Sequence, residues 1–235
     1  MNLRDFDVLT FDCYGTLIDW ETGIHQALTT ALPELDRSRD EVLEAFARHE
    51  SAVEAETPHR LYPEILARVF ERLESEWGLS TNPGAAELFG ASVGDWPAFD
   101  DSPAALRMLQ QHFKLVILSN IDRRSFAASE KRLGVTFDHV FTAEDIGSYK
   151  PDPRNFHYAL DRLAEVGVTQ GKILHTAQSL FHDHVPASEL GLATCWIDRR
   201  HDTEGWGATM PPPENVKVDF RFESLGAMAE AVSAA

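Results

Sequence analysis

The stretch LTFDCYGTLIDW, residues 9–20, decides the fold and raises the first functional question. It begins as a short apolar run of the kind found in fully buried strands. The run ends on a carboxylate, Asp12, and the chain then turns through Cys13-Tyr14-Gly15-Thr16. A charged group at the end of a buried strand is costly unless it is paired or hydrogen-bonded. Asp12 is therefore the first candidate for a functional residue.

Several other short apolar runs resemble this first strand, which we place at residues 7–11. They lie at residues 114–119, 139–143, 172–177, 193–198 and 218–222. Helical patterns separate the later runs, at residues 102–113, 123–134, 154–167 and 185–191. Strands that alternate with helices are typical of a doubly wound parallel sheet, so the sequence predicts a Rossmann-like α/β core.

Residues 21–100 interrupt this alternation, because they contain helical patterns and no convincing strand. Three such patterns are GIHQALTTALPEL, SRDEVLEAFARHESAVEAE and YPEILARVFERLESEWG. We therefore expect a helical cap over residues 17–99, inserted into a core domain made of residues 1–16 and 100–235.

The composition limits the classes of partner. The chain has 235 residues, of which 43% are hydrophobic, and its formal net charge is −17. Such a surface repels nucleic acid and anionic membranes, and an anionic substrate would need local positive charge.

The acidic start is not that of a signal peptide, and Cys13 and Cys195 read as buried free thiols, so we expect a cytoplasmic protein. The apolar residues of the predicted cap helices are compatible with a homodimer.

The strand ends carry the functional prediction. In open parallel sheets, ligands bind beyond the carboxyl ends of the strands. The first strand ends at Asp12 and the second at Ser119-Asn120, whereas the third and fourth lead to Lys150 and Asp183. We therefore expect a carboxylate, a hydroxyl, an amine and a second carboxylate to meet at one edge of the sheet.

This order of residues resembles the haloacid dehalogenase (HAD) superfamily, in which a cap is inserted at the same place. In the phosphatases of that superfamily, a second aspartate stands two residues after the nucleophile, where this chain has Tyr14. Mg²⁺-dependent members also carry an acid at the position of Gln178, and carboxylates are the direct ligands that Mg²⁺ prefers. The resemblance thus implies the 2-haloacid dehalogenase branch and no cofactor, with Mg²⁺ needed only if the chain were a phosphatase.

A narrower resemblance covers most of the chain. The segments FDCYGTLIDWETG, LVILSNIDR, GSYKP, HDH, RRHDTEGWGAT and VDFRF are similar to dehalogenase-like enzymes that hydrolyse L-azetidine-2-carboxylate by ring opening. Two features depart from the haloacid dehalogenases. No cap arginine stands in a convincing context among Arg37, Arg39 and Arg48, and Phe156 replaces a tyrosine six residues after the lysine. The leaving group, halide or ring amine, is therefore open.

The resemblance implies a hydrolase in which Asp12 attacks carbon 2 of a small-molecule carboxylate substrate and forms an ester. Water, activated by Asp183, would then release a 2-hydroxy acid. Lys150 would hold the charges, and Ser119 would donate a hydrogen bond. The residues expected to bind substrate are Tyr14, Thr16, Trp20, Asn120, Phe156 and His182.

Other interpretations stand beside this one. Lys150 is also compatible with a surface turn, Trp20 with a packed hinge, and Ser119 and Asn120 with an ordinary strand end. His175, His182 and His184 crowd the same segment as Asp183, but their spacing does not match a zinc site. A Mg²⁺-dependent phosphatase and a non-catalytic binding domain with this fold are the two alternatives to the hydrolase.

Overall fold

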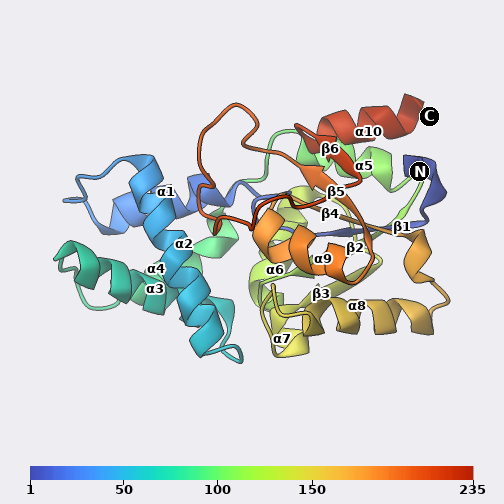
Figure 1. The fold of residues 1–235 in the computed structure, drawn as a ribbon. Coiled ribbons are helices and arrows are strands. Elements are labelled where there is room, and N and C mark those ends of the chain that lie inside the picture. The colour runs from blue at the N-terminus through green and yellow to red at the C-terminus, as the bar shows by residue number, and fades with distance from the viewer. Residues whose placement is uncertain (235) are drawn as a thin grey trace.

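The computed structural model describes residues 1–234 and has a parallel β-sheet at its centre (Figure 1). The sheet order is β3-β2-β1-β4-β5-β6, and every neighbouring pair of strands is parallel. The strands are β1 (Val8–Phe11), β2 (Lys114–Ser119), β3 (His139–Thr142), β4 (Ile173–Ala177), β5 (Ala193–Ile197) and β6 (Phe220–Phe222). The predicted α/β class and the doubly wound parallel sheet are confirmed.

Helices cover both faces of the sheet. Successive residues of β1 point to opposite faces, and accordingly Leu9 and Phe11 join one apolar cluster whereas Val8 joins another. The first cluster includes side chains of α5 (Ser102–Leu109), α6 (Arg123–Leu133) and α10 (Leu225–Ala234). The second includes side chains of α8 (Arg154–Glu165) and α9 (Val185–Glu189), and a short helix, α7 (Ala143–Ile146), follows β3. Because β1 is covered on both faces and flanked by two strands, its end is a rigid support for Asp12.

Four helices lie to one side of the sheet, between β1 and β2 in the sequence (Figure 1). They are α1 (Trp20–Ala31), α2 (Arg39–Glu56), α3 (Tyr62–Trp77) and α4 (Ala85–Ala91). Local signals set their limits: Ser38 and Glu41 form a capping box at the start of α2, and α3 ends at Gly78 in a left-handed conformation.

The chain leaves the core and returns to it at one crossing point. Ile18 pairs antiparallel with Ala98. On either side of this pair, Asp19 N donates to Pro97 O at 2.8 Å, and Phe99 N donates to Leu17 O at 3.1 Å. We propose that this crossing is the boundary of a cap domain formed by residues 17–99.

A long loop after β5 reaches from the core toward the cap (Figure 1). Arg200 Nη1 bonds Glu21 Oε2 of α1 at 2.6 Å, and the backbone N–H of Ala208 donates to Glu21 Oε1 at 3.0 Å. A Cβ atom at Gly207 would lie 1.7 Å from Glu21 Oε1, so only glycine permits this approach. We refer to these contacts as the Glu21 tether.

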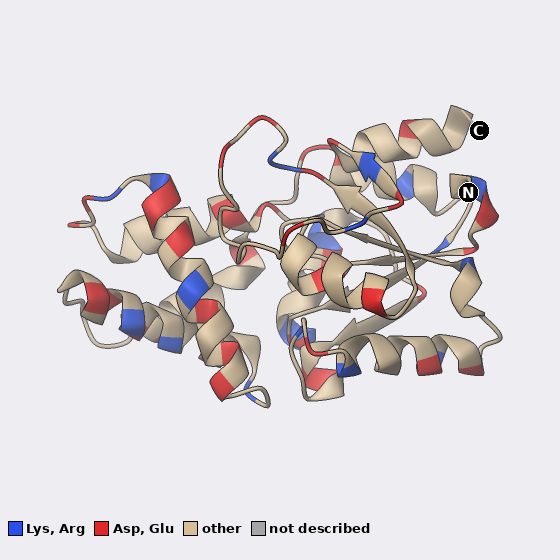
Figure 2. Cartoon of the chain, in the orientation of Figure 1, with Lys and Arg blue, Asp and Glu red and all other residues tan. Residues whose placement is uncertain are grey.

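Charged side chains are spread over both parts of the molecule, and acidic residues lie on the outer helices of the cap and of the core (Figure 2). Within residues 1–234, no helix is long and apolar enough to cross a bilayer.

Candidate active site

Asp12 continues the line of β1 beyond its last residue. Its backbone N–H donates to Thr176 O at 3.1 Å, which extends the pairing with β4 and fixes the direction of the side chain. Thr16 Oγ1 donates to Asp12 Oδ2 at 2.9 Å and itself accepts the backbone N–H of Gln178, so its one proton is available for Asp12. The turn between them needs Gly15, whose φ is 91° and whose Cβ would lie 2.9 Å from Trp20 Nε1.

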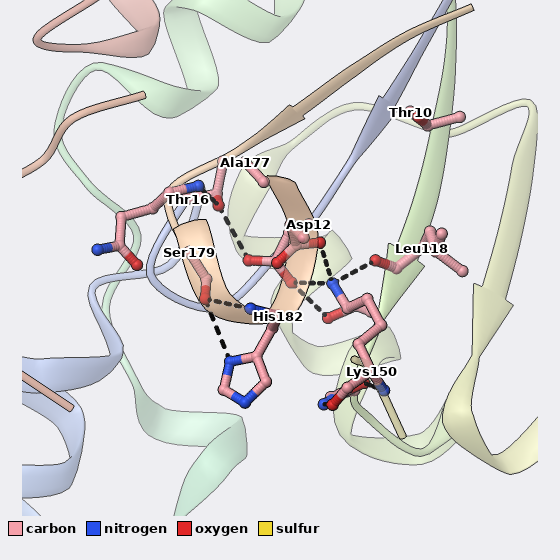
Figure 3. Close-up of polar contacts among 12 residues, drawn as sticks. Thr10, Asp12, Thr16, Leu118, Lys150, Ala177, Ser179 and His182 are labelled. Atoms are coloured by element: carbon pink, nitrogen blue, oxygen red, sulfur yellow. Dashed lines mark hydrogen bonds and ion pairs between the residues drawn. The ribbon is translucent and has the colours of Figure 1, made fainter. Parts of the chain in front are cut away.

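The ammonium group of Lys150 joins the two predicted carboxylates (Figure 3). Its Nζ lies 2.9 Å from Asp12 Oδ1, 2.6 Å from Asp183 Oδ1 and 3.0 Å from Leu118 O. An ammonium has three protons, so all of its donors are used. The side chain is only 2% exposed. The structure thus places Lys150 in the interior beneath the strand ends and not in a surface turn.

Burial and charge act against each other in this group. Burial alone would lower the pKa of Lys150, but Asp12 and Asp183 raise it above its ordinary value. Burial opposes ionisation of Asp183, yet the Lys150 ammonium and the His175 hydrogen bond hold the pKa of Asp183 well below its usual range. Burial and the Asp183 charge raise the pKa of Asp12, and Lys150 opposes that rise. Asp183 is therefore the firmly ionised partner, whereas the same forces leave the pKa of Asp12 raised.

His175 supports Asp183 from below. Its Nε2 lies 2.9 Å from Asp183 Oδ1, and its Nδ1 lies 2.9 Å from Thr10 Oγ1. Because an ionised carboxylate only accepts hydrogen bonds, Nε2 must donate to Asp183, and in a neutral ring Nδ1 then accepts from Thr10. The ring is completely buried, so this chain of bonds fixes the orientation of Asp183.

Asn120 fixes the backbone on which Lys150 stands. Asn120 Oδ1 accepts the backbone N–H of Lys150 at 2.7 Å, and Asn120 Nδ2 donates to the carbonyl of Lys150 at 3.0 Å. Ser119 Oγ lies 3.5 Å from Asp12 Oδ1, the outer limit of a hydrogen bond. Ser119 is the last residue of β2, the neighbour of β1 in the sheet, and Asn120 follows it directly.

A cavity of about 30 Å³ lies between these groups and the cap, with room for one or two water molecules. The core side of the cavity is formed by Asp12, Tyr14, Ser119, Asn120, Lys150, Ser179, His182 and Asp183. The cap side is formed by Trp20, Glu50, Glu54 and Tyr62.

Most of the residues selected from the sequence line this cavity, and two do not. Thr16 lies beneath the cavity and acts on Asp12 through its hydrogen bond. Phe156 lies outside it, so the expectation that Phe156 contacts substrate is corrected. α8 begins at Arg154 and turns Phe156 toward the sheet, where its ring packs edge-on against His175 with the ring centres 5.1 Å apart.

Sequence reasoning missed the two cap glutamates, together with Tyr62 and Ser179. Glu50 and Glu54 occur one helical turn apart on α2, on the face that also buries Phe46 and Val53. The available signal was that Glu50 and Glu54 are acidic residues at positions where the helical period predicts apolar core residues. The histidines of the segment also separate: His175 supports Asp183, His182 lines the cavity, and His184 Nε2 bonds the carbonyl of Ala177.

The donor set does not fit a Mg²⁺ ion. Lys150 Nζ already donates hydrogen bonds to Asp12 Oδ1 and to Asp183 Oδ1. Gln178, at the position of the missing acid, turns its side-chain oxygen toward Thr209, 3.5 Å away. Among residues 1–234 there is no group of three or more His, Cys, Asp or Glu side chains arranged to hold a metal ion.

Comparison with known proteins places this geometry in a family. A model of haloacid dehalogenase-like hydrolases matches residues 6–175. An (S)-2-haloacid dehalogenase of Pseudomonas putida is 24% identical over 206 residues, which cover 84% of this chain and 88% of that protein. The haloacid dehalogenase-like hydrolase domain-containing protein 3 of Bos taurus is 31% identical over 140 residues, 58% of this chain, and the match spans 55% of that protein's length.

The fold is shared with solved structures. One is the L-2-haloacid dehalogenase of Xanthobacter autotrophicus with chloropropionic acid covalently bound, which superimposes with a TM-score of 0.77 at 18% identity. The superposition covers 97% of this chain and 98% of that one.

Proposed function

The chain belongs to the haloacid dehalogenase-like hydrolase family, and on that premise we propose that it is a metal-independent hydrolase that displaces a leaving group from carbon 2 of a small carboxylate. One observation carries the proposal: Asp12 lies buried at the end of the central strand, faces a cavity, and is held by Lys150 and Thr16. A Mg²⁺-dependent phosphatase of this superfamily would carry an acid two residues after Asp12 and another acid at position 178. This chain has Tyr14 and Gln178 at these two positions.

The first step is attack by an Asp12 carboxylate oxygen on carbon 2 of the substrate. The carbon–oxygen bond forms as the bond to the leaving group breaks, and an aspartyl ester results. The Lys150 ammonium opposes the rise in the pKa of Asp12 that burial causes, and it fixes Oδ1 while Thr16 fixes Oδ2. A desolvated, oriented carboxylate is a better nucleophile than one in water, because no hydration shell has to be removed.

The second step is hydrolysis of this ester by water at the carbonyl carbon of Asp12. We assign Asp183 to orient and deprotonate that water, through Oδ2, because Lys150 and His175 both bond Oδ1. Backbone N–H groups of the turn after Asp12, together with Ser119 Oγ, would stabilise the oxyanion. The products are free Asp12 and a 2-hydroxy acid.

Two substrate classes fit this chemistry. The relatives named (S)-2-haloacid dehalogenases, and the solved homologous fold with chloropropionic acid bound covalently, support a 2-haloacid. The sequence segments similar to azetidine-2-carboxylate hydrolases support a strained cyclic 2-amino acid. In both classes the substrate is a small carboxylate, and the same attack by Asp12 applies.

Mass spectrometry tests the shared mechanism. The protein with Asp183→Asn, which slows ester hydrolysis, is incubated separately with 2-chloropropionate and with azetidine-2-carboxylate. We expect an adduct on the peptide that contains Asp12, and we expect ¹⁸O from labelled water to enter Asp12 of the unmodified protein during multiple turnovers. Turnover by an Asp12→Asn variant without any adduct, or release of phosphate from a simple ester that EDTA abolishes, would contradict the proposal.

A further inference from the structure

One arginine of the core binds the turn that follows the proposed nucleophile, residues 13–16, which we call the nucleophile turn. Arg199, the second residue after β5, donates to the backbone carbonyl oxygen of Thr16 from Nη2 at 2.9 Å and from Nε at 3.2 Å. Thr16 is the residue whose hydroxyl donates to Asp12 Oδ2. A single residue therefore lies between this guanidinium and the carboxylate of Asp12.

The same guanidinium binds the chain where it returns from the cap. Arg199 Nη1 donates to both carboxylate oxygens of Asp101, at 2.8 and 3.0 Å, and Nη2 also donates to Ser102 Oγ at 3.3 Å. The central carbon of the guanidinium lies 4.0 Å from the centre of the Phe99 ring, in a cation–π contact. Arg199 thus joins the chain segment that leaves the core to the segment that returns to it.

The contacts of Arg199 require an arginine. A guanidinium has five N–H groups, and each of those in Arg199 has an acceptor. The side chain is 9% exposed, and Asp101 is its ion-pair partner. Burial of a charged side chain is costly unless it is paired and hydrogen-bonded. A lysine carries its N–H groups on one nitrogen and cannot reproduce the planar fork that reaches both chain segments.

We propose that Arg199 is a positioning residue of the reaction at Asp12, and that it acts by holding the backbone of Thr16. This role presupposes the proposed attack by Asp12 and adds to it a residue that does not touch the substrate. Leu17 follows Thr16 directly, and Leu17 O accepts the backbone N–H of Phe99 at the crossing between core and cap. Because Arg199 fastens both chains on the core side of that crossing, it keeps Thr16 in place relative to the rest of the core.

The reactivity of Asp12 depends on this placement in two ways. Thr16 Oγ1 fixes Asp12 Oδ2 while Lys150 fixes Oδ1, and misplacement of a reacting group by about 1 Å costs about a hundredfold in rate. Burial raises the pKa of Asp12, and the hydrogen bond from Thr16 lowers it, which favours the ionised carboxylate. A shift of Thr16 therefore weakens both the orientation and the ionisation of the nucleophile.

The test follows formation of the Asp12 ester by mass spectrometry in the full-length protein. The probe is (S)-2-chloropropionate or L-azetidine-2-carboxylate, whichever forms the ester faster with the wild-type protein. We expect Arg199→Lys to lower the rate of ester formation at saturating substrate about ten- to a hundredfold. The substrate concentration that gives half of this rate should change by less than about threefold, because Arg199 does not line the cavity and makes no uniform contribution to substrate binding.

A matched control separates this role from a general effect on the core. Arg221 bonds Asp198 through Nε and Nη2 and its central carbon lies 5.0 Å from the centre of the Trp196 ring, but it does not bind the nucleophile turn. Arg221→Lys should therefore form the ester at the wild-type rate. An equal loss in Arg199→Lys and Arg221→Lys would contradict a specific role for Arg199.

Urea denaturation shows whether Arg199→Lys is folded under the conditions of the assay. If it is not, Asp101→Asn takes its place, because this change weakens the hold on the guanidinium and leaves the nucleophile turn unaltered. Asp101→Asn should lower the same rate about two- to tenfold. A folded Asp101→Asn variant with the wild-type rate would overturn the proposal.

A double-mutant cycle shows whether Arg199 acts through Thr16. In a Thr16→Val background, which lacks the hydroxyl, Arg199→Lys should lower the rate by less than about threefold. In a Thr16→Ser background, which keeps the hydroxyl, the larger loss should remain. The same loss in both backgrounds would mean that Arg199 acts by another route and would overturn the proposal.

The pH dependence decides the question if Thr16→Val forms no ester at all. The rate requires an ionised Asp12 and falls as pH drops through its pKa. A weaker bond from Thr16 leaves that pKa higher, so the acid limb of the profile should lie at higher pH in Arg199→Lys than in the wild-type protein. An acid limb that does not move contradicts the proposal.

The outcomes for the two proposals are distinct. If the wild-type protein forms the Asp12 ester and Arg199→Lys forms it equally fast, or loses only apparent affinity, the role of Arg199 is overturned and the Asp12 mechanism stands. If the wild-type protein forms no ester with either substrate, the proposed function fails, and the role of Arg199 fails with it.

Discussion

At the scale of single residues, one ammonium compensates two carboxylates that would otherwise repel each other inside the protein. Lys150 Nζ lies within 2.9 Å of both Asp12 and Asp183, and all three side chains are nearly inaccessible to water. Without that ammonium, the two acids must either share a proton or remain charged in a medium that solvates them poorly. The stability of the folded core and the charge state of the nucleophile therefore depend on the same atom.

We predict that Lys150→Met lowers the free energy of unfolding by about 3–5 kcal/mol at pH 7, because it leaves two buried acids without a counter-ion. Urea denaturation measures the loss. Lys172→Met is the matched control, since Lys172 is about half exposed and contacts Asp7 at 3.7 Å, and it should change stability by no more than about 0.5 kcal/mol. Equal effects of the two substitutions would show that the buried ion pairs do not stabilise the fold.

Glu50 predicts a dependence of stability on pH. Its pKa is about 8 in the folded protein and about 4.5 in an unfolded chain, so between these values the folded state binds the extra proton. Stability of the wild-type protein therefore decreases as pH rises from about 4.5 to about 8, through this group alone. Glu50→Gln lacks this decrease and should be more stable by a few kcal/mol at pH 8, with no difference near pH 4.

Denaturation curves at several pH values, compared with those of Glu44→Gln, measure that difference. The Glu44→Gln variant should follow the wild-type protein at every pH, because Glu44 is exposed. A constant offset between Glu50→Gln and the wild-type protein from pH 4 to pH 9 would contradict the raised pKa.

At the scale of elements, the Glu21 tether joins the loop after β5 to the first helix of the cap. We predict that Gly207→Ala breaks this tether, because the added Cβ would overlap Glu21 Oε1. Hydrogen exchange should then become faster in the first turn of α1 and in residues 200–208. Gly205→Ala is the control: Gly205 also has a positive φ, 76° against 60° for Gly207, but its Cβ would lie 3.8 Å from the nearest atom. Equal acceleration in both variants would assign the effect to backbone strain alone.

The elements that position Asp12 are those that the sequence predicts well. An apolar run followed by Asp12 needs no tertiary information. The meeting of Ser119, Lys150 and Asp183 beyond the carboxyl ends of the strands follows from the rule for parallel sheets. The cap wall was not predictable in the same way, because the pattern of α2 shows which face is buried and not what that face meets. Phe156 illustrates the same limit. It stands six residues after Lys150, where the haloacid dehalogenases carry a tyrosine, but the start of α8 turns its side chain toward the sheet.

At the scale of the whole molecule, the cavity is too small for the reaction that it is proposed to contain. A volume of about 30 Å³ holds one or two waters, whereas a 2-substituted propionate has six or more heavy atoms. The cap must therefore move away from the core for substrate to enter. The paired segments around Ile18 and Ala98 are the two chain crossings at which that motion can occur, and the Glu21 tether opposes it. Closure over the substrate would exclude water from the attack by Asp12.

The net charge of −17 predicts how salt affects substrates of different charge. A haloacid anion is repelled by the whole molecule, whereas a cyclic 2-amino acid is a zwitterion and has no net charge. The Debye length falls from about 30 Å at 0.01 M salt to about 10 Å at 0.1 M, so added salt screens the repulsion. From 0.01 M to 0.3 M, kcat/KM for (S)-2-chloropropionate should rise about two- to tenfold, while that for L-azetidine-2-carboxylate should change by less than about twofold. Sodium sulfate and sodium chloride at matched ionic strength distinguish screening from inhibition by chloride. If both substrates respond alike, the charge of the molecule does not govern access to the site, and selectivity lies in the cavity alone.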